Sequence, residues 1–361
     1  MRRFLIALLL VLPALATAAD QEPLTVATWG GAYEDSQRKA YFDPFAAETG
    51  IPIQTADYAG GVKPLREQIN GDGLVWDVAD MTMADHRQAC QEGLLERFDP
   101  TRLAPAPDGT AALRDFIASG FTPCGVAHNV FSMVYAFDKR AFPGAQPYRI
   151  EHLFQPDKFP GQRAFHKRPD ALLEWALISY GVPAKELYSL LSTERGMKLA
   201  FKRLDRIRDD IVWWSDPAKA VELLLRDDVA FSMGYNGRFF DAAVVENEPI
   251  EIVWDAQVYE LEVWGIPRGA DQAESARRFI RFATRTESLV AQTRYIAYGP
   301  TRESANRRVD KHATAGVLMR PHMPTNPLHM DRAIKKDVNW YARTRDRLDE
   351  RFDAWLAAGD K

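Results

Sequence analysis

Apolar and polar positions along this chain follow two periods that alternate in a regular order. Short apolar runs at 24–29, 51–56, 76–81 and 130–137 have the character of β-strands. Between them, the stretches 34–47, 64–70 and 85–93 repeat apolar residues at helical spacing. Strands that alternate with helices predict an α/β fold with a parallel, helix-covered sheet.

The second half of the chain continues this alternation with different residues. Pro169 and Pro217 each lie where a helix begins, because proline fits the first helical turn. The run VYELEVWGIP at 258–267 is a strand by its alternation and is followed by a helix over 273–284. The tail at 331–357 predicts a long charged helix that packs its apolar residues on the folded body. Those residues are Trp340, Leu348, Phe352 and Trp355.

Residues 1–19 have the pattern of a secretory signal peptide. Arg2 and Arg3 precede an apolar run at 4–15, and small residues follow at 16–19. The run is shorter than the roughly 20 residues that a membrane-spanning helix needs. We therefore predict a cleaved signal and a periplasmic protein; the alternative is an uncleaved anchor.

Length and charge limit the remaining classes. A chain of 361 residues exceeds what one hydrophobic core usually serves, so two domains are expected. The formal net charge is −4, and loss of the two signal arginines makes it more negative. This balance gives no reason to expect a nucleic-acid partner.

The two cysteines, Cys90 and Cys124, predict one disulfide, since an even pair in an oxidising compartment is usually bonded. The alternative, a catalytic thiol, lacks an accompanying Cys-His signature. The sequence also contains no HExxH, GxSxG or P-loop motif. We therefore predict no catalytic residue, no metal site and no cofactor.

Several motifs occur in an order that is seen in one family. They are TWGGAYEDSQRKAYFDPFAAETGI, WDVADM, ACQEGLLE, CGVAHNVFSMVYAFD, WWSDPAKAVELL, SMGYNGR, VYELEVWGIPRG and YGPT. In this order the chain resembles the periplasmic solute-binding proteins of ABC importers, in the branch of the spermidine/putrescine-binding proteins. The resemblance covers nearly the whole mature chain.

The resemblance implies a two-lobed α/β fold of the type II periplasmic-binding-protein class, with two crossover strands and the ligand in the cleft. Lobe 1 would comprise 20–135 and 266–310. Lobe 2 would comprise 136–265 and 311–361, with the C-terminal helix packed on it. A monomeric receptor that delivers its ligand to an inner-membrane permease is implied as well.

The glycine turn after the first strand is a candidate ligand contact. In open α/β sheets, ligands bind at the carboxyl ends of strands. Trp29 to Tyr33 would lie at such an end, where Gly30 and Gly31 permit a sharp turn and close approach of the backbone to the ligand. Thr82, which follows the run at 76–81, is a further candidate. The alternative is a simple tight turn with Trp29 in the core.

Two glutamates on one strand are the most informative feature. Because side chains alternate along a strand, Glu260, Glu262 and Trp264 share one face. Burying two carboxylates requires a cation, which a ligand would supply. In the resemblance, Glu262 matches an acidic residue that contacts an ammonium, and Glu260 matches an aromatic position. The alternative is a solvated face.

Aromatic residues at predicted strand ends could enclose the alkyl chain of an amine and give cation–π contacts. These candidates are Trp29, Tyr33, Trp213, Tyr235 and Tyr298. Trp213 and Trp214 point to opposite faces of a strand, so at most one of the two is expected to line the cleft. Each of these aromatic residues could instead belong to the core.

One segment departs from the polyamine-binding pattern. Where those proteins have acidic residues, this chain has His166, Lys167 and Arg168. A basic helix start can hold an anion, and Arg168 is the candidate; the alternative is an exposed basic patch. We predict a non-catalytic receptor for a small organic amine of the polyamine type. The alternatives are a zwitterionic or anionic, amino-acid-like solute, or a secreted enzyme on the same fold.

Overall fold

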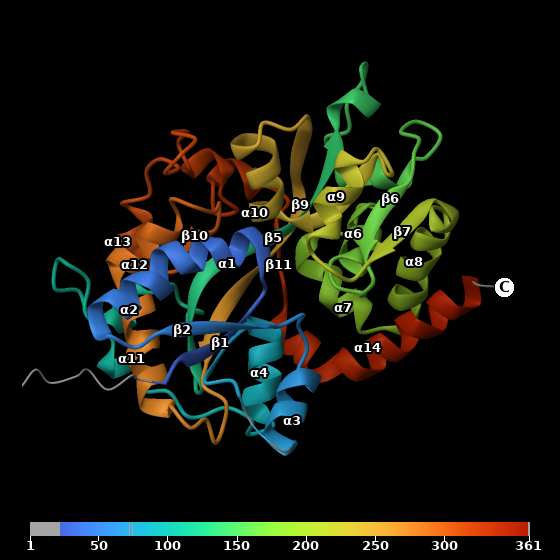
Figure 1. Ribbon diagram of the computed structural model, residues 1–361. Coiled ribbons are helices and arrows are strands. Elements are labelled where there is room, and N and C mark those ends of the chain that lie inside the picture. The colour runs from blue at the N-terminus through green and yellow to red at the C-terminus, as the bar shows by residue number, and fades with distance from the viewer. Residues whose placement is uncertain (1–21, 72, 74, 360–361) are drawn as a thin grey trace, which may run out of the picture.

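The computed structural model describes residues 22–71, 73 and 75–359, so the predicted signal peptide lies outside the described residues. The strands form one mixed sheet in the order β2-β1-β3-β9-β5-β8-β6-β7. The short strands β4 (Phe121–Thr122) and β10 (Gly299–Pro300) attach to β5, and β11 (Ile334–Lys335) attaches to β9. Helices gather around each end of this sheet (Figure 1).

The first group of elements is built on β1 (Leu24–Thr28), β2 (Ile53–Asp57) and β3 (Val78–Thr82), which run parallel. Their helices are α1 (Gly31–Gln37), α2 (Asp43–Thr49), α3 (Lys63–Asn70), α4 (Met83–Gln91), α5 (Ala112–Asp115), α11 (Ala273–Ala283), α12 (Thr286–Gln292) and α13 (Glu303–Asn306). A π-helical turn over Arg38–Phe42 joins α1 to α2, so the predicted helix at 34–47 is one continuous helical run.

The second group is built on β6 (Arg163–His166), β7 (Ile211–Trp214) and β8 (Phe231–Tyr235), which are also mutually parallel. Its helices are α6 (Leu172–Ile178), α7 (Leu187–Leu191), α8 (Glu194–Asp205), α9 (Lys219–Leu225) and α10 (Asn236–Phe240). The apolar face of α6 is fully buried, and Trp175 anchors it by donating a hydrogen bond to the carbonyl of Ala256 at 2.9 Å.

Two long strands, β5 (Gly125–Asp138) and β9 (Ile250–Gly265), connect the groups. β9 pairs antiparallel with β3 at one end, and β5 pairs antiparallel with β8 at its far end. They are the two crossover strands that the resemblance implied. The predicted parallel, helix-covered sheet is found within each group. The run at 130–137, however, belongs to β5, which is antiparallel to β8 and β9, because an apolar run does not reveal strand direction.

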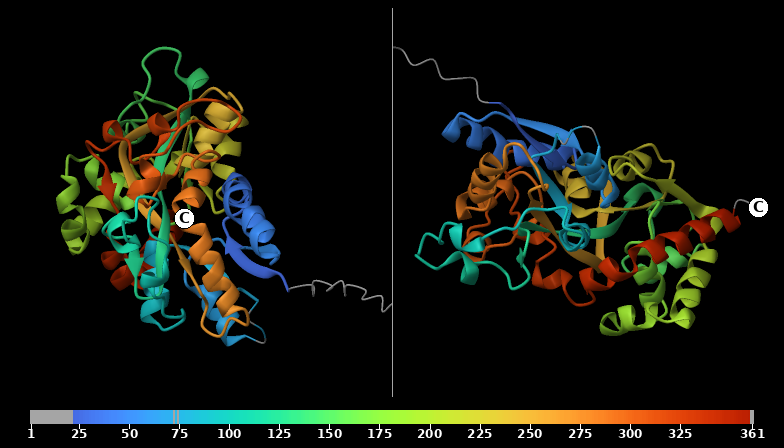
Figure 2. Two further views of the ribbon diagram at one scale, coloured as in Figure 1. Left: turned by 90° about the vertical axis from the view of Figure 1, so that its left-hand side faces the viewer. Right: turned by 90° about the horizontal axis from the view of Figure 1, so that it is seen from below.

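The C-terminal helix α14 (Val338–Gly359) packs on the second group. Its buried Trp340, Tyr341, Leu348, Phe352 and Trp355 join the same core as Trp175. Figures 1 and 2 show α14 extending from the region of α4 along the second group. At its start, Asn339 Oδ1 accepts a hydrogen bond from Arg87 of α4 at 2.8 Å, so the helix contacts both groups.

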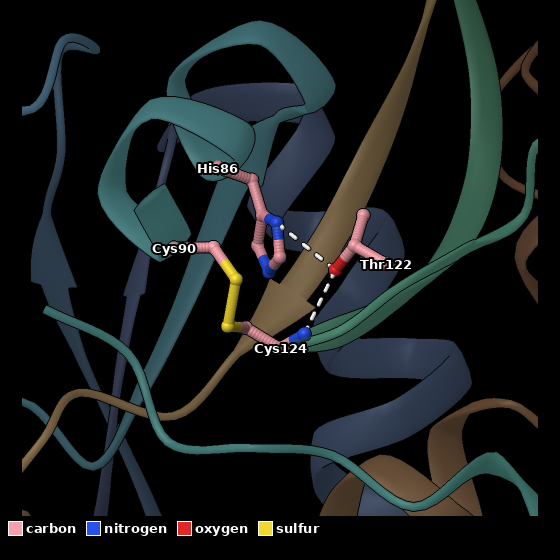
Figure 3. The surroundings of a disulfide bond; sticks show 4 residues. All are labelled: His86, Cys90, Thr122 and Cys124. Atoms are coloured by element: carbon pink, nitrogen blue, oxygen red, sulfur yellow. Dashed lines mark hydrogen bonds between the residues drawn. A yellow bond between two sulfur atoms is a disulfide. The ribbon is translucent and has the colours of Figure 1, made fainter. Parts of the chain in front are cut away.

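The predicted disulfide between Cys90 and Cys124 is confirmed, with Cα atoms 5.9 Å apart (Figure 3). Beside it, the backbone N–H of Cys124 donates to Thr122 Oγ1 at 3.1 Å, and that hydroxyl lies 3.4 Å from His86 Nδ1. The bond fixes the end of α4 to the start of β5. Among the described residues, no helix combines the length and the apolar character needed to cross a membrane.

Candidate functional site

Two small cavities lie between the groups, on the face of β9 that carries Glu260 and Glu262. The larger encloses about 40 Å³ and the smaller about 10 Å³, and Trp29 and Tyr235 line both. Trp29 follows β1, and Tyr235 ends β8. The cavities therefore lie at the carboxyl ends of parallel strands from both groups, which is where open α/β sheets bind ligands.

Most of the predicted site residues line these cavities. Thr82, Arg168 and Glu260 contribute to the larger cavity, whereas Tyr33, Glu262 and Tyr298 contribute to the smaller one. Thr82 also caps α4, because its Oγ1 accepts a hydrogen bond from the Asp85 N–H at 3.3 Å.

Trp213 lies elsewhere. Its ring packs against Phe352 and Trp355 of α14, with ring centroids 5.8 and 6.1 Å apart. Trp214 stacks on His166 at 4.3 Å, behind the cavity wall. Neither tryptophan is among the lining residues, because the tail helix covers one face of β7 and His166 covers the other.

Glu262 is a buried carboxylate that lacks a full set of partners. Glu262 is only 5% exposed, and within the described residues its Oε2 accepts no hydrogen bond. Burial, followed by the nearby Asp80, Glu260 and Asp85, raises its pKa well above the usual range. The indole N–H of Trp29 makes no hydrogen bond of ordinary length among the described residues, although it faces Glu262 and acts to lower the pKa of that carboxyl. Such groups are costly when buried alone, so this part of the site is suited to a ligand that supplies a positive charge.

Aromatic rings surround the Glu262 side of the site. The Tyr33 hydroxyl donates to Asp80 Oδ2 at 2.7 Å and accepts from Asn129 Nδ2 at 3.0 Å, so its ring is held in place. The rings of Tyr33 and Tyr298 lie 5.5 Å apart. Ring faces beside a carboxylate form a setting in which an ammonium gains both charge pairing and cation–π contact.

Glu260 already has a cation partner within the protein. Lys336 Nζ lies 2.8 Å from Glu260 Oε2, and the Ala84 N–H donates to Oε1 at 2.7 Å. Lys336 also donates to Asp170 at 2.8 Å, and Arg345 binds the same carboxylate through two bonds of 2.7 and 2.9 Å. Glu260 therefore needs no ligand to supply its cation, and the expectation that a ligand does so stays a prediction for Glu262.

Arg168 brings a positive charge to the larger cavity. Its nearest carboxylate contact is Asp170, whose Oδ2 lies 3.7 Å from Nε, which is too long for a hydrogen bond. Burial lowers the pKa of the neighbouring His166 to about 3, so that ring is neutral, and Lys167 is exposed. Of the predicted basic run, Arg168 is thus the residue available to an anionic group.

The glycine turn allows a contact across the cleft. Arg238, from α10, donates hydrogen bonds to the carbonyls of Trp29 and Gly30 at 2.9 and 3.1 Å. Gly30 and Gly31 have φ of +64° and +58°, and a Cβ on Gly31 would lie 2.6 Å from Arg238 Nη1. The sharp turn is as predicted, and the group that approaches closely is this arginine.

Sequence reasoning missed Arg238, Lys336 and Arg345. Arg238 ends the quoted motif SMGYNGR, but nothing in that motif indicates that its side chain crosses to β1. Lys336 and Arg345 belong to the tail, whose charges have the pattern of an ordinary solvated helix. Among the described residues, no group of three or more His, Cys, Asp or Glu is arranged to hold a metal ion.

A much larger cavity, of about 820 Å³, lies on the opposite face of β9, where Tyr259 and Leu261 line it. The Glu260–Lys336 pair lines this cavity as well as the small one. The small cavities differ from it in that they lie at the strand ends and include Glu262, whose Oε2 has no hydrogen-bond partner among the described residues.

Residues 40–325 match the family described as bacterial extracellular solute-binding protein. The chain belongs to this family. Solute-binding proteins of this type capture small molecules and deliver them to the permeases of ABC transporters, and they are not enzymes. The two-lobed periplasmic-binding-protein fold that the sequence predicted is thereby confirmed.

The relatives support this assignment over almost the whole chain. A γ-aminobutyric acid (GABA)-binding protein of Pseudomonas aeruginosa is 32% identical over 345 residues, covering 95% of this chain and 94% of its own. A GABA receptor of known structure is 26% identical, with a TM-score of 0.77 and coverage of 92% and 97%. The periplasmic binding protein AgtB of Agrobacterium tumefaciens R10, solved with agropinic acid, is 25% identical, with a TM-score of 0.79 and coverage of 93% and 99%. These relatives do not confirm the predicted spermidine/putrescine branch.

Proposed function

We propose that this solute-binding protein is a periplasmic receptor for a small zwitterion that carries one ammonium and one carboxylate, such as GABA. The observation that carries the proposal is the unpartnered Glu262 carboxylate in one cavity and the available Arg168 guanidinium in the adjoining one. Trp29 and Tyr235 line both cavities and would flank the chain between the two charges.

The size of the cavities supports a short ligand. A water molecule needs roughly 10–15 Å³ of such space, so cavities of about 40 and 10 Å³ accommodate only a few water-sized groups. A four-carbon amino acid suits this volume better than spermidine does. Two of the relatives carry GABA in their names, which supports the same ligand class.

Charge also favours the zwitterion over the polyamine that the resemblance implied. A polyamine needs a second acidic site, but Glu260 and Asp170 are already paired with Lys336, Arg345 and Arg168. The remaining carboxylate of the larger cavity, Asp85, shares that cavity with these three cations. Arg168 would repel a second ammonium in the larger cavity and attract a carboxylate. The zwitterionic alternative considered from the sequence is therefore the better reading of the site.

Binding is proposed to close the two lobes, for which we retain the boundaries 20–135 with 266–310 and 136–265 with 311–361. Glu262 on β9, Trp29 after β1 and Arg168 after β6 approach one ligand only when the lobes meet. The permease would then recognise the closed monomer.

Calorimetry with GABA and putrescine, on the parent and on Arg168→Ala, tests the proposal. The parent should bind GABA more tightly than putrescine. Arg168→Ala should weaken GABA binding roughly ten- to a hundredfold and leave putrescine binding unchanged or improved. Putrescine binding more tightly than GABA to the parent, with no loss of GABA affinity in the variant, would overturn it.

A further inference from the structure

The ammonium of Lys336 lies in a setting that resembles a binding site for a ligand cation. Its Nζ is 2.8 Å from Glu260 Oε2 and 2.8 Å from Asp170 Oδ1, and it lies 4.5 Å from the centroid of the Tyr341 ring. Two carboxylates and an aromatic face are what a protein uses to hold a desolvated ammonium. Here the cation comes from the chain itself.

This site lies beside the proposed ligand ammonium. Glu260 and Glu262 project from the same face of β9, two residues apart, which separates their Cα atoms by roughly 7 Å. Lys336 and Glu260 line the same cavity as Arg168 and Trp29. The two glutamates therefore mark two cation positions at a spacing that the ends of a short diamine can span.

We propose that Lys336 is a resident ammonium that fills the second cation position and so makes the protein select ligands with a single positive charge. This inference rests on the proposed function, in which Glu262 receives the ligand ammonium. Asp170 pairs with Lys336, Arg345 and Arg168, and Glu260 pairs with Lys336, so neither of these two carboxylates is free to hold a second ammonium. Asp85, which accepts a hydrogen bond from the Gly61 N–H at 2.9 Å, is the remaining carboxylate of that cavity. A diamine would bring its second charge against Lys336, and selectivity would arise from that repulsion.

The position of Lys336 in the chain explains how a short segment can perform this role. It follows directly after the two-residue strand β11, and its backbone N–H donates a hydrogen bond to the Tyr259 carbonyl of β9 at 3.1 Å. The Lys336 side chain is buried in the site, whereas the side chain of its neighbour Lys335, the last residue of β11, is exposed. Lys335→Met is therefore a matched control for Lys336→Met.

The test measures the dissociation constants of putrescine and GABA for ligand-free parent, Lys336→Met and Lys335→Met by calorimetry. Removing the resident ammonium should leave Glu260 free for a ligand, so Lys336→Met should bind putrescine at least tenfold more tightly than the parent does. Lys335→Met should behave as the parent. The double variant Glu260→Gln/Lys336→Met, which removes both charges, should lose the gained putrescine affinity.

A folded Lys336→Met protein that binds GABA but gains no putrescine affinity would overturn the inference, and so would an equal gain in the double variant. If Lys336→Met is too unstable for calorimetry, its melting temperature provides the readout. Putrescine should raise it more than GABA does, and equal shifts would overturn the inference. Failure of the parent to bind GABA, by contrast, would refute the proposed function whatever the lysine variants do.

Discussion

Replacing Glu262 with glutamine should weaken ligand binding while stabilising the ligand-free protein. The substitution keeps the shape of the side chain and removes its charge. In the ligand-free state that charge is buried, lacks a partner on Oε2, and lies near Asp80, Glu260 and Asp85. The same charge would be paired when an ammonium binds.

The expected loss of affinity follows from one charge-assisted hydrogen bond. Such a bond contributes about 1.5–3 kcal/mol, which corresponds to roughly a ten- to hundredfold change in the dissociation constant. Glu251→Gln is the matched control, because Glu251 lies on the same strand but is exposed. It should bind the ligand as the parent does.

The pH dependence of stability has a definite sign. The pKa of Glu262 in the folded protein is raised above its unfolded value, so folding favours the neutral carboxyl. This contribution is fully present below the unfolded pKa and is lost as the pH rises through the folded pKa. Above that range the Glu262→Gln protein should be more stable than the parent when no ligand is present.

Titration calorimetry with GABA at pH 7 and denaturant unfolding between pH 4 and 8 measure both effects. We expect Glu262→Gln to lower the affinity for GABA and to raise the stability of the ligand-free protein. Unchanged GABA affinity in Glu262→Gln would refute the assigned role of the carboxylate. If the stability of the ligand-free variant relative to the parent does not increase as the pH rises across this range, the argument that the Glu262 charge is unpaired is wrong.

Other changes test separate parts of the structure. Glu260→Gln should destabilise the protein by roughly 3 kcal/mol in urea unfolding, because it breaks a buried ion pair, and should change GABA affinity little. Unchanged stability together with a large loss of GABA affinity would contradict the pairing of Glu260 with Lys336. Gly31→Ala should weaken GABA binding more than Gly30→Ala does, since both positions have positive φ but only a Cβ on Gly31 would collide with the Arg238 side chain. Equal effects in calorimetry would exclude a role for this contact. Reduction of the Cys90–Cys124 disulfide should lower the free energy of unfolding by roughly 3–4 kcal/mol, as expected for a loop that spans 34 residues. Free-thiol titration of the unfolded, unreduced protein should find no thiol, and two reactive thiols would contradict the bond.

The sequence predicted those parts of the site that depend on local periodicity. The alternation along 258–267 placed Glu260 and Glu262 on one face, and Trp29, Tyr33 and Tyr235 were found from their positions at strand ends. The sequence could not predict that Lys336 pairs with Glu260, because that contact depends on how the tail folds back along β9. Trp213 failed as a cavity residue for the same reason, since α14 covers its face of β7. The antiparallel direction of β5 and β9 is likewise a property of the whole sheet.

The central claim is that one ligand is held by its ammonium at Glu262 and by its carboxylate at Arg168. Calorimetry of the ligand-free parent with GABA, n-butylamine and butyrate tests it most directly, because the three compounds share a four-carbon chain and differ in the charged ends. We expect GABA to bind at least tenfold more tightly than n-butylamine or butyrate, each of which carries a single charge. If n-butylamine binds as tightly as GABA, Arg168 contributes no carboxylate contact and the proposed ligand class is wrong.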